Sequence, residues 1–301
     1  MVIGFIGAGN MGGAIIKGYA SKLAEANAHE DATSQLAFSS IIVYDKDEAK
    51  LEKLTTEFSS IQAAATVDQV LLEADAIVLA TKPQIFDDLL DGIDLKGYLL
   101  AEGKVWVSIA AGISIAYLER KLTEGTEVSG ACACNPNPQA QKKPKVIRVM
   151  PNLPAMVGVG TAGLSRNGEV TDEEFAEVRA VFGAIGKAEE VDESLMDTVV
   201  AVSGSGPAYV FMFIDAMIKA GVEFGMDESI AKTLAAQTVK GAAQMVQESD
   251  DSPNQLKINV CSPGGTTIEA VDYLEKEADF YATIKEAMKR VSDKSKAMTK
   301  K

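Results

Sequence analysis

The sequence predicts an α/β domain with a doubly wound, mainly parallel sheet, followed by an all-α domain. Two observations support this prediction. Short apolar runs alternate with helical patterns through residues 1–165, which is typical of a parallel sheet with helices on both faces. From Thr171 onward nearly every segment has helical periodicity. Since domains contain roughly 150 residues each, the chain fits two of them, and we expect their bounds at 1–168 and 169–301.

The expected strands of the first domain are short and apolar, and helical segments separate them. We place five strands at Val2–Ile6, Ile41–Tyr44, Ala76–Thr81, Val105–Ala110 and Val146–Met150. Helices are expected at Asn10–Ala26 and Glu48–Phe58. Because apolar residues follow one another directly in each strand, both faces of the sheet must be covered by helices.

The second domain begins with a helix start, in which Thr171 is the N-cap and Glu174 stands at the third helical position. Two longer helices, expected at Ala208–Phe224 and Glu228–Gln247, carry Ala and Gly at close intervals and few charges on one face. Such helices lie either in a deep core or at a subunit interface. In a domain of this size we favour the interface, and therefore a homodimer or a higher oligomer of dimers.

Charge and composition bound the partners of the protein. The net charge is −14 and the pI about 4.7, which argues against nucleic acid and anionic membrane as partners. The most apolar stretch, Val199–Ile218, contains Gly204, Pro207 and Asp215, so we expect a buried helix there and no membrane span. The N-terminus has no basic segment of a signal peptide. A cytoplasmic protein is expected.

The cysteines and the histidine give no metal site. Cys132, Cys134 and Cys261 are odd in number, and the first two are too close for an easy bridge, so free thiols in a reducing compartment are expected. The single histidine, His29, stands far from them in a polar stretch. With so few soft ligands, no metal is expected.

The first motif is Gly7-x-Gly9-x-x-Gly12, which follows a strand and opens a helix. This is the context in which glycines allow a tight turn and the helix N-terminus binds a dinucleotide pyrophosphate. The second strand ends at Asp45-Lys46, later than usual because residues 27–39 form a polar insertion. An acid there accepts the ribose hydroxyls of NAD and repels the 2′-phosphate of NADP, whereas the lysine attracts that phosphate. The cofactor is therefore NADPH or NADH.

Two further strand ends point to the same crevice, because ligands of doubly wound sheets lie beyond the carboxyl ends of the strands. These ends are Ala80-Thr81-Lys82-Pro83 and Ile109-Ala110-Ala111-Gly112. Their small residues leave room for ribose and nicotinamide. Lys82 either contacts a phosphate or is solvated.

A second glycine loop, Ser262-Pro263-Gly264-Gly265-Thr266-Thr267, runs into another helical segment. Its backbone N–H groups and helix start can bind a carboxylate, while Thr266 or Thr267 can hydrogen-bond a ring nitrogen. The bland alternative is a glycine-rich helix start that binds nothing. Hydride transfer to a ketone needs a positioned proton donor, often His or Lys, and the lone histidine is poorly placed. An imine suits this chain better, because its nitrogen can carry the proton before the hydride arrives.

Two segments resemble motifs of the pyrroline-5-carboxylate reductase family. They are Val202–Tyr209 (VSGSGPAY) and the glycine loop Ser262–Thr267 (SPGGTT). Four other segments are similar to the family in the same order along the chain: Ile3–Gly12, Ala80–Pro83, Ala110–Gly112 and Val146–Asn152. The resemblance implies a Rossmann domain followed by a helical dimerisation domain. It also implies NAD(P)H-dependent reduction of 1-pyrroline-5-carboxylate to L-proline, the last step of proline biosynthesis.

The resemblance also implies roles for individual residues. The substrate carboxylate would lie on the backbone of Gly264, Gly265, Thr266 and Thr267, with the Thr267 hydroxyl, the expected catalytic group, near the ring nitrogen. Glu193 matches a substrate-side acid of the family. The helical domain of one subunit would complete the site of the other. The implied cofactor contacts are Ile6, Gly7, Ala8, Gly9, Asn10, Met11, Asp45, Lys46, Ala80, Thr81, Lys82, Pro83, Ile109, Ala110, Ala111 and Asn259.

The chain departs from the family at a few positions, and two other functions stay open. Val67 stands where the family often has an asparagine at the cofactor ribose, and the insertions at 27–39 and 125–144 are long. A β-hydroxyacid dehydrogenase would need a catalytic lysine in the first long C-terminal helix, where Lys219 is the only lysine in 206–224. A non-catalytic NAD(P)-sensing protein would not need a carboxylate loop.

Overall fold

The computed structural model describes residues 1–28, 36–82, 86–91, 103–123 and 143–299. The predictions made for Pro83, His29, Cys132 and Cys134, and for most of the two insertions, lie outside these residues. The chain forms two compact units. We call Met1–Gly204 with Ser292–Lys301 the sheet unit, and Ser205–Val291 the helical unit.

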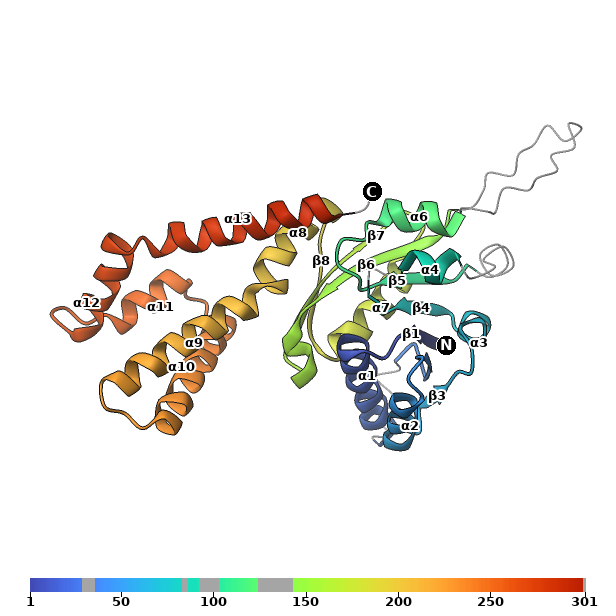
Figure 1. The fold of residues 1–301 in the computed structure, drawn as a ribbon, viewed down its shortest axis with the longest axis horizontal. Helices are drawn as coiled ribbons and strands as arrows, with labels where there is room; N and C mark the ends of the chain where they lie inside the picture. The colour runs from blue at the N-terminus through green and yellow to red at the C-terminus, as the bar shows by residue number, and fades with distance from the viewer. Residues whose placement is uncertain (29–35, 83–85, 92–102, 124–142, 300–301) are drawn as a thin grey trace, which may run out of the picture. The chain divides into compact units, whose positions relative to one another are not determined.

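The sheet unit is built on one twisted sheet, in which the described residues supply eight strands in the order β3-β2-β1-β4-β5-β6-β7-β8 (Figure 1). Neighbouring strands are parallel except β6 and β7, which are antiparallel. The first six strands have the order of a dinucleotide-binding sheet, in which the strand order reverses between β1 and β4. The strands are β1 Val2–Ile6, β2 Ser40–Tyr44, β3 Ile61–Ala63, β4 Ala76–Leu79, β5 Val105–Ser108, β6 Lys145–Pro151, β7 Gly160–Arg166 and β8 Gly186–Glu190.

Helices cover both faces of this sheet because successive strand residues point to opposite sides. Ile3 and Phe5 of β1 belong to the core under α1, α2 and α7, whereas Ile6 belongs to the core under α3, α4 and α6. Short helical turns link the later strands. The helices are α1 Asn10–Ala28, α2 Glu48–Glu57, α3 Val67–Glu73, α4 Phe86–Asp91, α6 Ile115–Thr123, η2 Leu153–Val157, α7 Asp172–Gly183, η3 Glu193–Leu195, α8 Met196–Val199 and η4 Val200–Gly204.

The helical unit begins with an antiparallel pair of helices held together by small residues. A Cβ on Gly221 would lie 3.4 Å from the Cβ of Ala231, so the two backbones approach closely. Within residues 205–291, all of them described, Ala231 and Ala235 are the only buried residues. The elements are α9 Gly206–Glu223, α10 Glu228–Glu248, α11 Pro253–Val260, α12 Thr266–Asp272, η5 Tyr273–Glu277 and α13 Phe280–Met298, whose last residues belong to the sheet unit.

The five expected strands and the two expected helices of the first domain are confirmed to within a few residues. The capping box is confirmed too, since Thr171 Oγ1 accepts the Glu174 N–H and Glu174 Oε2 accepts the Thr171 N–H. The helical periodicity expected after Thr171 is confirmed except at Gly186–Glu190, which forms β8 along the edge of β7. The compact sheet unit therefore extends past 168, to Gly204.

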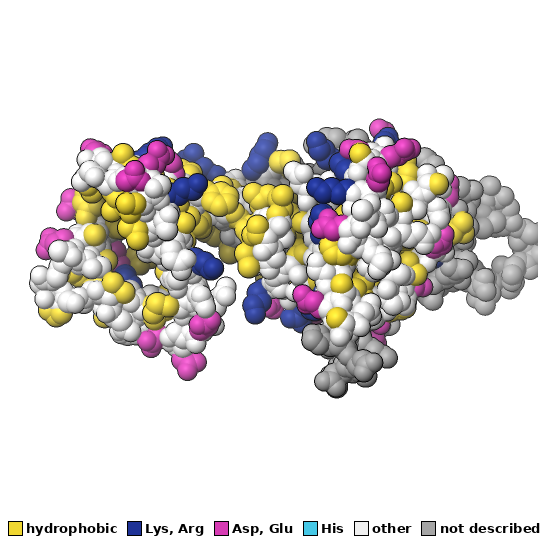
Figure 2. All heavy atoms as spheres, turned by 90° about the horizontal axis from the view of Figure 1, so that it is seen from below, with side chains coloured by type: hydrophobic (Ala, Val, Ile, Leu, Met, Phe, Trp, Pro, Cys, Tyr) yellow, Lys and Arg dark blue, Asp and Glu magenta, His cyan; other side chains and the backbone are white. Residues whose placement is uncertain are grey.

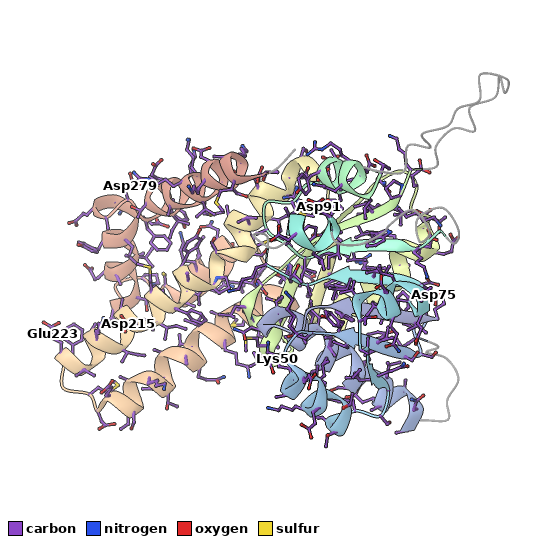
Figure 3. All side chains as sticks on the ribbon, turned by 45° about the vertical axis from the view of Figure 1, so that its right-hand side comes forward. Lys50, Asp75, Asp91, Asp215, Glu223 and Asp279 are labelled. Carbon is purple, nitrogen blue, oxygen red and sulfur yellow. The ribbon has the colours of Figure 1, made fainter. Side chains whose placement is uncertain are left out.

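The stretch Val199–Ile218, which we expected to form a buried helix, is helical but largely unburied in the structure of a single chain. Its main part is α9, which buries none of its residues. One continuous helical stretch, Glu193–Glu223, is long and apolar enough to cross a membrane by length and composition alone. The charged residues Asp215 and Glu223, labelled in Figure 3, lie on α9, and Asp215 is ion-paired with Lys219 at 2.6 Å. Figure 2 shows hydrophobic side chains at the surface of the helical unit.

Candidate active site

The glycine loop after β1 is closely packed on the end of β4, the strand beside β1 at which the strand order reverses. Gly7 has φ +107°, a conformation that other residues rarely adopt. A Cβ at Gly7 would lie 2.8 Å from the Ala80 carbonyl oxygen, and a Cβ at Gly12 would lie 2.5 Å from the Gly7 oxygen. Any larger residue would push apart the loop, α1 and the end of β4. The first and third glycines of the motif therefore hold the backbone together.

The middle glycine has a different surrounding. A Cβ at Gly9 would have no atom within 4 Å, and both Gly9 and Asn10 are exposed. The open space lies at the N-terminus of α1, whose first-turn N–H groups have no partner within the helix. Unpaired N–H groups and the positive end of the helix dipole suit a pyrophosphate. These residues fit the phosphates of a dinucleotide.

Asp45 lies at the end of β2 and is joined to the glycine loop. Its Oδ2 accepts the backbone N–H of Ala8 at 2.6 Å, and its Oδ1 accepts that of Asp47 at 2.9 Å. Lys50, labelled in Figure 3, lies 3.5 Å from Oδ1. Burial raises the pKa of Asp45, but the two N–H donors and Lys50 outweigh it and hold the pKa below its ordinary value. The carboxylate is therefore ionised beside the loop, while Lys46 is exposed.

The ends of β4 and β5 complete this edge of the sheet. The Ala80 N–H donates to the Ile6 carbonyl at 2.9 Å, and the Ala110 N–H donates to Ser108 Oγ at 3.2 Å. Thr81 Oγ1 is buried and has no hydrogen-bond partner among the described residues. Since buried hydroxyls are normally paired, this oxygen fits a polar group of a bound cofactor. Lys82 and Ala111 are exposed at the same edge.

The structure thus brings together the described residues of the predicted cofactor site at the carboxyl ends of β1, β2, β4 and β5. They are Ile6, Gly7, Ala8, Gly9, Asn10, Met11, Asp45, Lys46, Ala80, Thr81, Lys82, Ile109, Ala110 and Ala111. Asn259, the other predicted cofactor residue, lies on α11 of the helical unit. There its amide group donates to Asp251 at 3.2 Å and accepts from Gln255 at 2.8 Å.

The predicted carboxylate loop forms a turn before α12. Gly264 has φ +71°, and the Gly265 N–H donates to the Ser262 carbonyl at 2.9 Å. Gly265 is the N-cap of α12, which has no side-chain cap, whereas Ser252 and Asp227 cap α11 and α10. The first N–H groups of α12 are therefore open to an external acceptor. Thr267 is half-buried in this first turn, and Thr266 is exposed.

Glu193, predicted on the substrate side, is hydrogen-bonded to two other elements of the sheet unit, α6 and β6. Its Oε1 accepts the Ile115 N–H at 2.7 Å and the Arg148 guanidinium at 3.1 Å. Arg148 lies in β6, with only 7% of its side chain exposed. No role was predicted for Arg148, although one charged residue within the apolar run Val146–Met150 indicates a buried partner.

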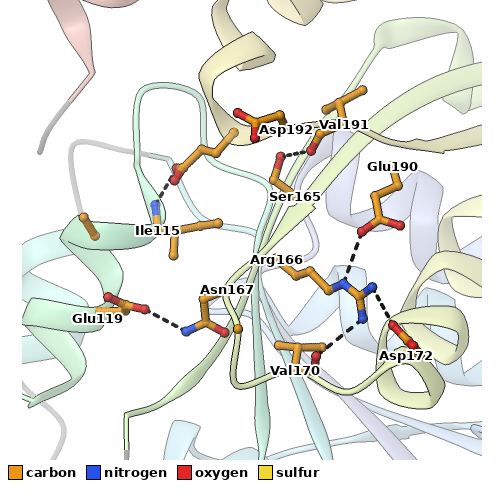
Figure 4. A pocket seen from close by; sticks show the side chains of 13 residues that line it. Ile115, Glu119, Ser165, Arg166, Asn167, Val170, Asp172, Glu190, Val191 and Asp192 are labelled. Atoms are coloured by element: carbon orange, nitrogen blue, oxygen red, sulfur yellow. Dashed lines mark hydrogen bonds and ion pairs between the residues drawn. The ribbon is translucent and has the colours of Figure 1, made fainter.

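A cavity of about 870 Å³ lies beside this ion pair, between the first turns of α6 and the ends of β7 and β8 (Figure 4). None of the predicted cofactor residues lines it, and Glu193 is the one predicted substrate residue that does. Arg166 is neutralised there by Glu190 at 3.1 Å and Asp172 at 2.6 Å. Among the charged residues that line the cavity, five are acidic and Arg166 is the one cation, so the cavity suits neither a phosphate nor a substrate carboxylate. Among the described residues, no three His, Cys, Asp or Glu side chains are placed to hold a metal.

Two family models match the chain. The model described as pyrroline-5-carboxylate reductase dimerisation matches residues 193–298, and that described as NADP oxidoreductase coenzyme F420-dependent matches residues 2–112. Among curated proteins, pyrroline-5-carboxylate reductase of Escherichia coli (strain K12) is 40% identical over 99% of this chain and 98% of its own length. The enzyme of that name from Methanosarcina acetivorans is 37% identical over 99% of this chain and 98% of its own length.

Solved structures give the same result. A pyrroline-5-carboxylate reductase from Coxiella burnetii is similar with a TM-score of 0.82 and 28% identity, covering 99% of this chain and 98% of its own. The pyrroline carboxylate reductase of Plasmodium falciparum, solved with NADP bound, has a TM-score of 0.74 and 32% identity, covering 100% of this chain and 98% of its own.

Proposed function

This chain belongs to the pyrroline-5-carboxylate reductase family, and on that premise we propose that it reduces 1-pyrroline-5-carboxylate to L-proline with NADPH or NADH. The observation that carries the proposal is the match to reductases of this name over 99% of the chain, at 40% identity. The glycine loop and the ends of β2, β4 and β5 fit the cofactor. The hydride comes from the reduced nicotinamide of that cofactor.

The chain's own residues bind and orient the two reactants. We assign the pyrophosphate to the N-terminus of α1 beside Gly9, and the adenosine ribose to Asp45 at the end of β2. With the adenosine ribose held by Asp45, the ends of β4 and β5 on the other side of β1 would hold the nicotinamide half. Thr81 Oγ1 has its hydrogen-bonding capacity free for that half.

The substrate loop holds the imine. In this proposal the carboxylate of the substrate lies on the backbone from Gly264 to Thr267 and accepts from the uncapped N–H groups of Thr266 and Thr267, because the Gly265 N–H already donates to Ser262. The Thr267 hydroxyl hydrogen-bonds the ring nitrogen and so fixes the ring for hydride attack on the adjacent carbon. An imine nitrogen that is already protonated needs no strong general acid, which agrees with the lack of a histidine other than His29 in the sequence.

A second copy of the chain is the partner that suits the helical unit. Phe211, Met212 and Phe213 of α9 are respectively 55%, 72% and 49% exposed. Contiguous apolar side chains of this kind are normally covered by a partner. The match to a dimerisation model over 193–298 supports self-association. We further propose that the α12 loop of one subunit serves the cofactor site of another, and that the protein works in the cytoplasm without nucleic acid or membrane partners.

A direct assay tests the proposed function. Purified protein is mixed with 1-pyrroline-5-carboxylate and either NADPH or NADH, and the absorbance of the reduced cofactor is followed. Oxidation with at least one cofactor, with L-proline as product, is expected. If neither cofactor is oxidised, the reductase function is wrong. A 3-hydroxy acid with NAD or NADP is the matched control. It should give no turnover, because Lys219 is ion-paired with Asp215 on the exposed side of α9.

A further inference from the structure

The loop from β5 to α6 carries the predicted nicotinamide-side residues Ile109, Ala110 and Ala111, and it is anchored at both ends. At its start, the buried Ser108 hydroxyl accepts the Ala110 N–H at 3.2 Å. At its end, the N–H of Ile115, the first residue of α6, donates to Glu193 Oε1 at 2.7 Å. The second anchor is not local, because Glu193 lies 78 residues further along the chain.

Arg148 fixes the carboxylate that makes this second anchor. In the register of β5 and β6, Arg148 lies opposite Ser108, the residue of the first anchor. Its guanidinium donates to the same Oε1 at 3.1 Å, so one oxygen accepts both from the sheet and from the start of α6. A buried guanidinium needs a paired anion, and a carboxylate with a charged donor and a backbone donor is held in one orientation. Ile115, labelled in Figure 4, marks the α6 end of this link.

We propose that Glu193 and Arg148 are a positioning pair, which holds the loop at 109–114 in the conformation that receives the nicotinamide half of the cofactor. This inference rests on the proposed function only in its choice of substrate, since the sheet order itself directs that half toward β4 and β5. Glu193 then acts on the cofactor through Ile115 and the loop. The pair lies within the sheet unit and leaves the Asp45 side of the crevice untouched.

The pair therefore has different consequences for the two halves of the cofactor. Removing the anchor by Glu193→Ala frees the nicotinamide-side loop but leaves the glycine loop and Asp45 unchanged. Affinity for the whole reduced cofactor should fall about tenfold, the loss expected for one charge-assisted hydrogen bond. Affinity for ADP-ribose, or 2′-phospho-ADP-ribose if NADPH is the cofactor, should be unchanged. The kcat should fall by on the order of 10- to 100-fold, because small errors in placing a reacting group are costly.

The experiment is calorimetric titration of the full-length protein with the reduced cofactor and, separately, with the ADP-ribose fragment. Glu190→Ala is the matched control, because Glu190 makes an ion pair of the same 3.1 Å length with Arg166 but touches neither anchor of the loop. It should bind both ligands as the unmodified protein does. Glu193→Asp provides a second variant if Glu193→Ala does not fold. Its charge still compensates Arg148, but the shorter side chain cannot reach Ile115 and Arg148 together.

Two results overturn the proposal. An equal loss of affinity for the fragment and for the whole cofactor in Glu193→Asp would mean that the pair only stabilises the sheet unit. A rise in the KM for 1-pyrroline-5-carboxylate, with unchanged cofactor affinity, would mean that Glu193 contacts the substrate directly. The binding comparison does not depend on turnover. If the unmodified protein oxidises neither cofactor, the proposed function fails while the positioning pair is still decided.

Discussion

The sheet unit and the helical unit place their apolar residues in opposite ways. The sheet unit buries large side chains on both faces of the sheet, among them Phe5, Trp106 and Phe182. The helical unit buries only Ala231 and Ala235 within its fully described residues. Burial of apolar surface is the main stabilising contribution to a fold. The sheet unit therefore has a core of its own, whereas the helical unit needs another surface to cover it.

The largest expected effect comes from charging the exposed face of α9. In the double variant Phe211→Glu and Met212→Glu, two apolar side chains of the proposed self-association surface become charged. Self-association should weaken by at least about 100-fold, since each side chain contributes roughly 1.5–3 kcal/mol when buried. Sedimentation equilibrium over a range of concentrations measures this. Leu72→Glu is the control, because Leu72 is 64% exposed on α3 of the sheet unit. An unchanged oligomer in the double variant would remove the contrast between the units.

The next largest effect concerns the substrate loop. Thr267→Ala should lower kcat by on the order of 100-fold, because the ring nitrogen loses its hydrogen-bond partner. Affinity for NAD(P)H should hardly change, since the cofactor loops belong to the sheet unit. Steady-state kinetics and cofactor titration separate the two quantities, and Thr267→Ser, which keeps the hydroxyl, should retain most of the activity. An equal loss of cofactor affinity would show that the loop was misassigned.

Two glycines of one loop should differ in what their replacement damages. Gly9→Ala adds a methyl group to open space, so melting should be unchanged while cofactor affinity falls about tenfold, as expected when a group occupies the place of a ligand. Gly12→Ala places a methyl group 2.5 Å from the Gly7 oxygen. It should lower the free energy of unfolding by about 1–3 kcal/mol. Thermal melting with and without cofactor distinguishes them. A stability loss in Gly9→Ala would contradict the assignment.

The smallest expected effect is on cofactor preference. Asp45→Ser removes the charge that repels a 2′-phosphate, and the ratio of NADPH to NADH efficiency should rise about five- to tenfold, as for one screened charge pair. Because the folded-state pKa of Asp45 is lowered, its charge is present above the unfolded value and is lost only as the pH falls through the lower one. The preference of the unmodified protein should thus be constant between about pH 7 and 8, where Asp45 and the 2′-phosphate, whose second pKa is about 6, both keep their charges. If Asp45→Ser does not improve use of NADPH, the repulsion hypothesis is wrong.

Much of the sheet unit could be predicted because most of its strands are visible as local patterns in the sequence. Val2–Ile6 and Ala76–Leu79 are continuous apolar runs, and the structure has them as strands. The strands β7 and β8 were missed because they lack such a continuous apolar run. The first, Gly160–Arg166, contains two glycines, and the second, Gly186–Glu190, has four polar or glycine positions and buries only Ala188. β8 is an edge strand that needs few buried residues, so its pattern is weak, whereas β7 lies inside the sheet and its glycines, threonine and serine interrupt the apolar run.

The residues of the candidate site also fall into two groups, those that local motifs predicted and those that only the fold brings together. The glycine motifs and Asp45 were found because their chemistry depends on neighbouring residues in the chain. The fold class and the family expected from these motifs are confirmed by the sheet order and by the full-length relatives. The link from Glu193 to Arg148 and Ile115 was not found, because it joins residues 45 and 78 positions apart. No local pattern encodes a contact of that range.

By itself the sequence determined the two glycine loops, the acid after the second strand and the family to which the chain belongs. These features depend on glycines, which free the backbone, and on a charged residue at a set distance from a strand. Both can be recognised from the order of the residues alone. The tertiary structure decided that Gly7 and Gly12 pack while Gly9 leaves space, that α12 is uncapped, and that Glu193 is bound by Arg148 inside the sheet unit. Those facts depend on which distant atoms meet, and folding alone brings such atoms together.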